Sequence, residues 1–374
     1  MSLNVTQNEI DLFTADLWKD IRKLQHYNTN GDLTIRRYSD TVISIEDELP
    51  FLEFLKKENP NWRIPQVISH TPDYIEFEYL NGIRLFNFII ELRILYLIEK
   101  SEKALNLMER IKAILTNQLL DFQKITLPWT KNISVQYPFV EKCFTPIELI
   151  ANVVGLSFNK EEVRNDISAI AEIVSKNSDA LFRDATPKNA ILHIPELYYD
   201  KFKYDDAARR IVIRSLVDSD FFTDELLKDK IYQFDFTGCV YLCPKIDDLI
   251  AINLHESMMW AKSSQKFFDD NCKDKVFLAT MFVRFIRFGG RKLAYRLLHK
   301  DGHIKRFRFD NEKYYFEKLQ DVVSRLQKLN LVKGNELIRI MKRFEDATVV
   351  IPTVDYFDPD GTKSESVYID VYPH

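Results

Sequence analysis

The sequence has little cysteine and little glycine, and each shortage excludes a kind of site. Among 374 residues there are only 4 cysteines and 9 glycines. Cys239 and Cys243 have no Cys or His companions at zinc-site spacing, so we expect the cysteines to be small buried apolar residues. Gly31 is the only early glycine, so no glycine-rich turn precedes the first strands.

A long hydrophobic run and a signal-like N-terminal segment are also missing. The most apolar window, residues 85–98, is interrupted by Glu91 and Arg93 and is too short to cross a bilayer. No early segment combines a basic start, an apolar stretch and a small-residue cleavage site. These absences predict a soluble, cytoplasmic protein with no membrane partner.

The chain also lacks an excess of positive charge. Its 52 basic and 56 acidic residues give a net charge of −4, which provides no whole-protein basic footprint for nucleic acid. The clearest basic stretch, residues 284–300, has apolar residues at helical spacing, so we interpret it as the solvated face of a helix. We expect no nucleic-acid partner.

Apolar patterning is abundant, and it divides the chain into two parts. Hydrophobic residues make up 46% of the sequence, with 27 Phe and 17 Tyr, which is enough for a sizeable core. Residues 1–80 read as a hairpin, a helix and a second strand pair that closes at Asn81-Gly82. Amphipathic helices dominate residues 81–345. Residues 346–374 are predicted to form an irregular, acidic tail.

Polar residues interrupt an apolar run at LFRDATPKNAIL, residues 181–192. Asp184 and Asn189 would stand at the two ends of a loop between short strands, and Pro187 would stiffen that loop. Further along, IYQFDFTG places Asp235 at the end of another apolar run. Each of these residues alone fits an ordinary loop or turn position. Their ordered occurrence in one chain points to a site.

This series resembles the aminoglycoside phosphotransferase and choline kinase group, small-molecule relatives of the protein kinases. The catalytic loop of the group runs Asp-x-x-x-x-Asn, which DATPKN matches, and its metal-binding Asp has a setting that FDF matches. A later helix start is matched by DLI at Asp248. The resemblance implies an α+β, protein kinase-like fold with a strand-rich N-terminal lobe (1–80) and a helical C-terminal lobe (81–345). Relative to that group, the chain carries an insertion at about 195–229.

By this resemblance the protein is a kinase that moves the γ-phosphate of ATP to a small-molecule substrate. The acceptor would be a hydroxyl of a small polar metabolite, of the aminoglycoside, sugar or amino-alcohol type. Asp184 would hold and deprotonate that hydroxyl, because in-line transfer needs an oriented nucleophile. Asn189 and Asp235 would bind Mg2+, which prefers oxygen ligands. Asp248 would cap its helix or brace the catalytic loop.

The resemblance also implies a nucleotide site in the first 80 residues. Arg36 stands where the group carries a phosphate-touching lysine, and Glu48 fits the helix glutamate that pairs with that cation. A hinge would hydrogen-bond adenine through backbone groups. The hinge residues are Phe77, Glu78, Tyr79 and Leu80.

The chain departs from the group at several positions. Phe182 replaces a histidine before the loop, and Thr186 replaces a histidine or lysine two residues after the aspartate. Arg36 keeps the charge of the usual lysine but changes its shape. Together with the missing glycine loop, these departures support an alternative: a pseudokinase-like binding or scaffolding protein with a degraded nucleotide site. A third possibility is a protein kinase that acts on another chain, but this sequence lacks the Ala-Pro-Glu-like signature after Asp235 that would support it.

The only indication of the acceptor in the sequence is the charge of the residues around the loop. Asp184, Asp235, Asp247 and the Asp205-Asp206 pair make the neighbourhood of the loop acidic, which favours a cationic or sugar-like acceptor. An electropositive cleft would count against that hypothesis. Nothing in the sequence indicates an oligomeric state.

Overall fold

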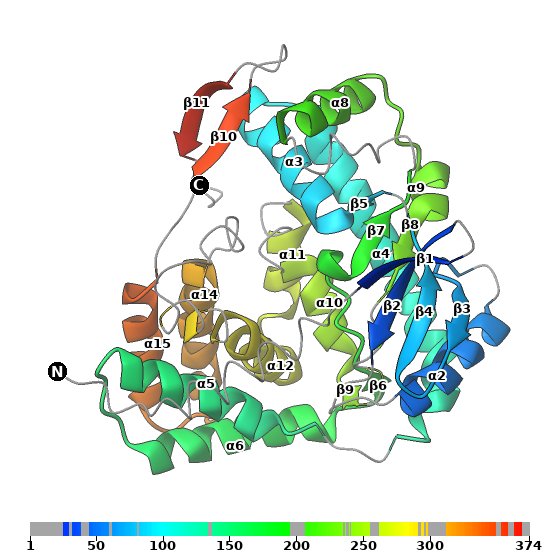
Figure 1. Ribbon diagram of the computed structural model, residues 1–374. Helices are drawn as coiled ribbons and strands as arrows, with labels where there is room; N and C mark the ends of the chain where they lie inside the picture. Colours follow the sequence, from blue (N-terminus) through cyan, green and yellow to red (C-terminus); the bar gives the residue numbers. More distant parts are fainter. Residues whose placement is uncertain are drawn as a thin grey trace.

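The computed structural model shows an α+β protein, in which a four-stranded sheet stands beside a larger group of helices (Figure 1). Asp235 and residues 11–20, for which the sequence indicates a helix, lie outside the described residues. The described residues are 25–29, 32–38, 45–59, 62–80, 82–133, 137–194, 206–234, 236, 239, 241–254, 262–290, 293–294, 297, 312–348, 353–357 and 363–368.

The four strands near the N-terminus form an antiparallel sheet in the order β1-β2-β4-β3. Their pairings confirm the hairpin and the second strand pair expected from the sequence. Ile75 on β4 is fully buried, and α2 packs Phe51 and Leu55 into the same core. The bounds are β1 Gln25–Thr29, β2 Asp32–Tyr38, α2 Ile45–Glu58, β3 Val67–His70 and β4 Tyr74–Glu78.

Long helices form the rest of the molecule, as the amphipathic pattern predicts. In α4, the apolar stripe through Leu105, Met108 and Phe122 is buried. The bounds are α3 Leu85–Glu99, α4 Glu102–Thr130, α5 Phe139–Val153, α6 Lys160–Lys176, α10 Lys245–Leu254, α11 Lys262–Asn271, α12 Lys275–Phe285, α14 Glu312–Lys328 and α15 Glu336–Asp346.

Short polar side chains begin several of these helices. Each accepts a hydrogen bond from the backbone N–H three residues later, which satisfies a donor that has no partner within the helix. Asp274 Oδ1, for example, accepts from Phe277 N at 2.8 Å and so sets the start of α12. Ser101 and Asn159 cap α4 and α6 in the same way.

Two small sheets support the segment 182–189. The strand β6 (Ala180–Leu181) pairs with β9 (Leu242–Cys243) before the segment. After it, β7 (Ala190–Leu192) lies between β5 (Ile83–Arg84) and β8 (Ile231–Gln233). The loop predicted between two short strands is therefore confirmed, and both of its ends are tied to distant parts of the chain.

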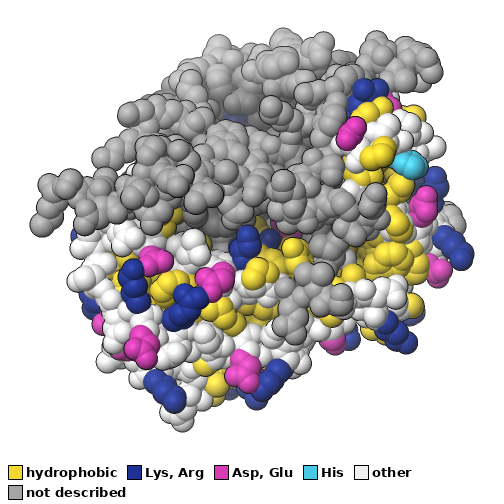
Figure 2. Space-filling model, turned by 60° about the horizontal axis from the view of Figure 1, so that its bottom comes forward, with side chains coloured by type: hydrophobic (Ala, Val, Ile, Leu, Met, Phe, Trp, Pro, Cys, Tyr) yellow, Lys and Arg dark blue, Asp and Glu magenta, His cyan; other side chains and the backbone are white. Residues whose placement is uncertain are grey.

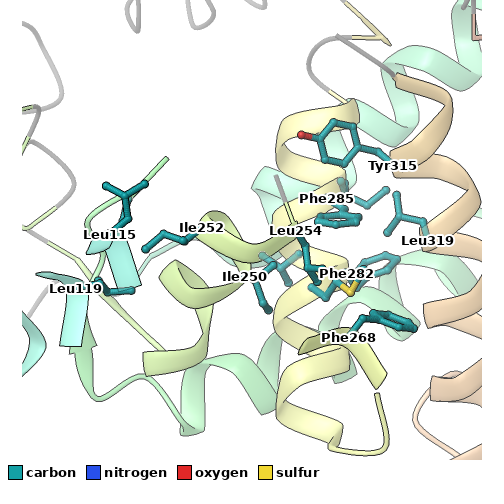
Figure 3. Close-up of a cluster of buried hydrophobic side chains, with 14 of the residues drawn as sticks. Leu115, Leu119, Ile250, Ile252, Leu254, Phe268, Phe282, Phe285, Tyr315 and Leu319 are labelled. Atoms are coloured by element: carbon teal, nitrogen blue, oxygen red, sulfur yellow. The ribbon is translucent and has the colours of Figure 1, made fainter. Parts of the chain in front are cut away.

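A buried cluster of apolar side chains joins helices from different parts of the chain (Figure 3). The Phe285 ring of α12 meets the Tyr315 ring of α14 edge to face, with centroids 4.9 Å apart. Burying a side chain of this size stabilises the fold by about 1.5–3 kcal/mol. The cluster draws on α4, α10, α11, α12 and α14 through Leu115, Leu119, Ile250, Ile252, Leu254, Phe268, Phe282, Phe285, Tyr315 and Leu319.

The insertion expected at about 195–229 contains two helices, α8 (Asp206–Asp218) and α9 (Asp224–Lys230). Arg210 of α8 forms a buried ion pair with Glu91 of α3, with Nε and Oε2 2.9 Å apart. Arg110 of α4 donates to Asp224 at the start of α9. The helices α8 and α9 of the insertion are thus packed against α3 and α4, as Figure 1 also shows.

The tail contains a hairpin, so the expectation of an irregular segment is wrong there. The strands β10 (Thr353–Phe357) and β11 (Lys363–Tyr368) pair antiparallel. The sequence between them, DPDG, is a turn signal that would have indicated a hairpin.

Charges of both signs are interspersed on the described surface (Figure 2). Between α5 and α6, Arg164 pairs with Glu141 and Lys160 pairs with Glu148, all four on the outside of the molecule. Exposed pairs of this kind each contribute about 0–1 kcal/mol. None of the described helices combines the length and the apolar character needed to cross a bilayer.

Gly82 is required by the close approach of β5 to β7. A Cβ at this position would overlap the carbonyl oxygen of Leu192, a backbone atom that cannot rotate away. We expect Gly82→Ala to lower the free energy of unfolding by about 1–3 kcal/mol, measured by urea denaturation. Gly155→Ala is the control, since only its φ of 66° opposes a side chain there and nothing lies within 4 Å. Equal losses in the two variants would contradict this account.

The Arg210–Glu91 pair should stabilise the position of α8 strongly. Arg210→Met leaves the Glu91 carboxylate buried without this partner, so we expect a loss of about 3–5 kcal/mol. The double variant Arg210→Met/Glu91→Leu should lose less than the single variant. Lys103→Met, which breaks the exposed pair with Asp220, is the control and should cost less than about 1 kcal/mol. A double variant as unstable as the single would contradict the prediction.

Candidate functional site

The segment from Asp184 to Asn189 forms a closed loop. The carbonyl oxygen of Asp184 accepts hydrogen bonds from Thr186 N at 2.6 Å and from Asn189 Nδ2 at 2.9 Å. Asp184 itself has a φ of 55°, in the left-handed region that only a few residue types, including Asp, adopt readily. Asp184 and Asn189, predicted as the two ends of the loop, are therefore brought together by the loop itself.

Asp248, at the start of α10, braces this loop. Its Oδ2 accepts from Arg183 N at 3.1 Å and its Oδ1 from Ala185 N at 3.0 Å, so the carboxylate holds the backbone on both sides of Asp184. Asp248 is fully buried. Of the two roles that the resemblance left open for Asp248, the structure shows the bracing one.

The Asp184 carboxylate is held on one side by an arginine. Arg284 Nη2 donates to Asp184 Oδ1 at 2.7 Å, and Arg284 Nη1 donates to Asp247 Oδ2. Burial alone would lower the pKa of Arg284, but Asp247, Asp184 and Asp248 raise it above its ordinary value. The Asp184 side chain keeps 26% of its surface exposed, and among the described residues no hydrogen bond reaches its Oδ2.

Arg284 belongs to the basic stretch 284–300, and its burial corrects our interpretation of that stretch as a solvated helix face. Its side chain is only 4% exposed. It lies in the last turn of α12, which the cluster of Figure 3 holds in place through Phe282 and Phe285. The apolar residues at helical spacing do face the core, but at Arg284 the remaining face meets carboxylates rather than water.

A second arginine of the same stretch, Arg287, lies among aromatic rings. It sits in a π-helical turn, η4 (Ile286–Gly290), that follows α12. Its guanidinium carbon is 4.3 Å from the ring centroid of Phe182, 5.0 Å from that of Phe288 and 5.1 Å from that of Tyr137. Burial opposes its charge, but Tyr137 and Asp184 outweigh this and keep the pKa of Arg287 above its ordinary value. Phe182, the departure before the loop, is thus part of an arginine-binding cluster.

The charge balance around the loop differs from the sequence expectation. Asp184 and Asp247 both pair with Arg284, and Arg287 adds a further positive charge next to them. Asp235 and Asp205 lie outside the described residues. In the described part of the site, the acidic residues therefore give no support to a cationic acceptor.

The side-chain oxygen of Asn189 has the chemistry of a metal ligand. Its amide nitrogen is used inside the loop, which leaves the side-chain oxygen as the group that a hard cation would take. Phe234 N donates to the carbonyl oxygen of Asn189 at 3.1 Å. Phe234, the residue directly before Asp235 in the sequence, therefore lies beside Asn189. Within the described residues, no cluster of three or more His, Cys, Asp or Glu side chains could hold a metal ion.

In the N-terminal sheet, the cation Arg36 meets a buried glutamate. Arg36 Nε lies 3.5 Å from Glu76 Oε1, and its guanidinium carbon is 4.5 Å from the ring centroid of Tyr74. Glu76 also accepts hydrogen bonds from Thr34 Oγ1 and Ser69 Oγ, each at 2.6 Å. Burying a carboxylate requires such partners. Arg36 therefore ends in a polar cluster that joins three strands.

The other predicted nucleotide residues lie in α2 and at the end of β4. Glu48 is buried on α2, and its pairing with Arg36 stays a prediction. Phe77 and Glu78 are paired within β4, and Glu78 N donates to Gln66 O at 2.9 Å. Tyr79 and Leu80 follow the strand. Of the four hinge positions, the last two are the ones that lie beyond the sheet.

Sequence reasoning missed Arg284, Arg287 and Glu76. The two arginines are one helical turn apart in an apolar helix, which was a signal for buried charges that pair with the loop. Glu76 stands between Ile75 and Phe77, so strand alternation puts it on the opposite face of the sheet. Its partners become visible only when the register of β2, β3 and β4 is known.

The carboxylate of Asp248 should make stability depend on pH. Burial and the neighbouring Asp247 charge raise the pKa of Asp248 from 3.8 to about 6. A raised carboxyl pKa contributes stability that is full below the unfolded-state value and is lost as pH rises through about 6. As pH rises from 3.8 to about 6, the unfolding free energy of the wild type relative to that of Asp248→Asn should therefore fall. Above about pH 6 this difference should stay level.

Urea denaturation at several pH values measures this difference, and Asp229 provides a control of opposite sign. Its hydrogen bond with Lys230 lowers the pKa of Asp229, so the stability that Asp229 contributes is lost as pH falls. If the difference for Asp248→Asn rises with pH, burial does not dominate at Asp248.

Comparisons with known proteins found similarity only at the level of structure. No protein-family model matches the chain, and no curated protein matches its sequence. The choline kinase LicA from Streptococcus pneumoniae is 12% identical with a TM-score of 0.41, over 86% of this chain and 100% of that one. An ethanolamine kinase from Plasmodium vivax is 13% identical with a TM-score of 0.37, over 87% of this chain and 84% of that one. Both of these proteins are kinases.

Proposed function

We propose that the protein is an ATP-dependent phosphotransferase that moves the γ-phosphate to a hydroxyl of a small polar metabolite. In this proposal the fold is the protein kinase-like two-lobe type. The strand-rich part, residues 1–80, covers the nucleotide, and the helical part, residues 81–345, carries the catalytic loop. The acceptor is of the aminoglycoside, sugar or amino-alcohol type.

The observation that carries the proposal is the state of the Asp184 carboxylate. Arg284 fixes one oxygen at 2.7 Å, and among the described residues the other oxygen accepts no hydrogen bond. A general base must be held rigidly and must still offer an oxygen within hydrogen-bond reach of the hydroxyl it deprotonates. The positive φ of Asp184 and the Asp248 brace provide the rigidity, and Oδ2 is available to the hydroxyl.

Magnesium and ATP would supply the rest of the chemistry. Asn189 and Asp235 would hold Mg2+, which neutralises charge on the phosphate oxygens during transfer. Tyr79 and Leu80, with Phe77 and Glu78 before them, would border adenine. Arg36 would contact the phosphates from the strand β2.

A second candidate is a binding or scaffolding protein that keeps this fold. This second candidate is supported by the contacts of Arg36 with Glu76 and Tyr74. They engage the cation that the kinase proposal expects to touch the phosphates. In this second candidate the Arg36 guanidinium serves the sheet, where its Nε lies 3.5 Å from Glu76 Oε1. Such a protein would tolerate the loss of Asp184 without loss of function.

We expect Asp184→Asn to lower ATP turnover by about 10²- to 10⁴-fold, the usual contribution of a general base. Turnover is measured as ADP release with a panel of aminoglycosides, choline, sugars and nucleosides. The matched control is Asp247→Asn, which removes the other carboxylate from Arg284 but leaves Asp184 in place. It should lose similar stability and much less activity.

Nucleotide binding is measured separately, by the thermal shift with ATP and Mg2+. A ligand that binds only the folded state raises the melting temperature, and Asp184→Asn should keep that rise. No shift in the wild type at millimolar nucleotide would exclude the kinase and leave the scaffold. A shift with no ADP release from any acceptor would exclude transfer to these classes of metabolite.

A further inference from the structure

Arg284 and Arg287 lie one turn apart beside the same loop, but they differ in their partners. Arg284 donates to two carboxylates, Asp184 and Asp247. Arg287 contacts rings only. Among the described residues no hydrogen bond or ion pair reaches it, and its Nε is buried without an acceptor.

Arg287 is half-buried, and of its N–H groups only Nε–H is buried without an acceptor, which leaves that donor unsatisfied unless a ligand binds it. Buried polar groups almost always have a hydrogen-bond partner, and an unsatisfied charged donor costs more than a neutral one. Cation–π contacts with Tyr137, Phe182 and Phe288 each stabilise the charge of Arg287 by about 0.5–2 kcal/mol. They do not replace the hydrogen bond that the buried Nε–H would form in water. The protein thus holds a guanidinium with unused donors.

The chemistry of those donors selects the ligand. Stacking on rings uses the face of a guanidinium and leaves its N–H edge for a partner in the same plane. That edge matches the paired oxygens of a phosphate or carboxylate, which it binds through two parallel hydrogen bonds. Phe182 lies two residues before Asp184, and the charge of Asp184 acts on Arg287, so an oxyanion on Arg287 would lie in the neighbourhood of Asp184.

We infer that Arg287 is the anchor of an oxyanion-binding site, built by Tyr137, Phe182 and Phe288, beside Asp184. The π-helical turn Ile286–Gly290 supports this inference, because such turns occur frequently at functional sites. The oxyanion site also gives Phe182 a function: in place of a hydrogen-bonding residue, it supplies the ring nearest to Arg287.

The oxyanion has two possible sources, and naming them rests on the proposed function. It is either the γ-phosphate of ATP or an acidic group carried by the acceptor. Each source would place a phosphate or carboxylate against Arg287. Bound nucleotide would fill the oxyanion site if the source is the γ-phosphate, and would leave it empty if the source is the acceptor. Binding of the oxyanion itself requires no turnover.

The experiment measures binding of inorganic phosphate to the full-length protein by isothermal titration calorimetry and by thermal shift. We expect Arg287→Gln to weaken phosphate binding by about 10- to 100-fold, the value of a charge-assisted hydrogen bond. Arg287→Lys keeps the charge without the planar edge and should give an intermediate loss. Circular dichroism establishes that each variant is folded, and if Arg287→Gln does not fold, Arg287→Lys carries the test.

The matched control is Arg164→Gln. Arg164 also stacks on a ring, that of Phe144 at 4.9 Å, but it is exposed and paired with Glu141. It should bind phosphate as the wild type does. Equal phosphate binding by the wild type and both folded Arg287 variants, or none by the wild type at millimolar phosphate, would overturn the inference.

A non-hydrolysable ATP analogue with Mg2+ separates the two sources. If the γ-phosphate fills the site, the saturating analogue abolishes phosphate binding, and Arg287→Gln weakens binding of the analogue. If the acceptor fills it, phosphate still binds in the presence of the analogue. Phosphate binding that depends on Arg287, without ADP release from any acceptor, would reject the proposed kinase and retain the oxyanion site. ADP release with phosphate binding independent of Arg287 would do the reverse.

Discussion

The bridge from Asp184 through Arg284 to Asp247 is the interaction on which the site depends. A guanidinium that is 4% exposed needs opposite charges close by, and the buried carboxylate of Asp247 needs a positive charge in turn. The bridge joins the loop after β6, the start of α10 and the end of α12. Because those three elements come from different parts of the chain, the position of Asp184 depends on how they pack. Figure 3 shows part of that packing, between α10 and α12.

The same constraint explains the electrostatics of the loop. Asp247 and Asp248 are adjacent buried carboxylates, and burial raises the pKa of both. Arg284 offsets the repulsion among Asp184, Asp247 and Asp248. With it, Asp248 is free to hold the backbone at Arg183 and Ala185, so charge and hydrogen bonding serve one geometry.

The departures from the kinase-like pattern acquire physical meaning in this setting. Thr186 supplies no cation after the aspartate, but a cation reaches Asp184 from α12 instead. Phe182 does not leave the loop unanchored, because its ring packs against Arg287. Arg36 joins strands through its contact with Glu76. At these three positions the described contacts differ from those that the resemblance implies.

The sequence by itself determined the local elements: the hairpin, the helices, and the loop with Asp184 and Asn189 at its ends. Local periodicity and turn chemistry act over a few residues, so they can be read in order along the chain. It did not reveal that Arg284 and Asp184, 100 positions apart, share a hydrogen bond, or that Glu76 gathers partners from three strands. Those pairings depend on how helices and strands pack, and only the tertiary structure decides which buried charges meet.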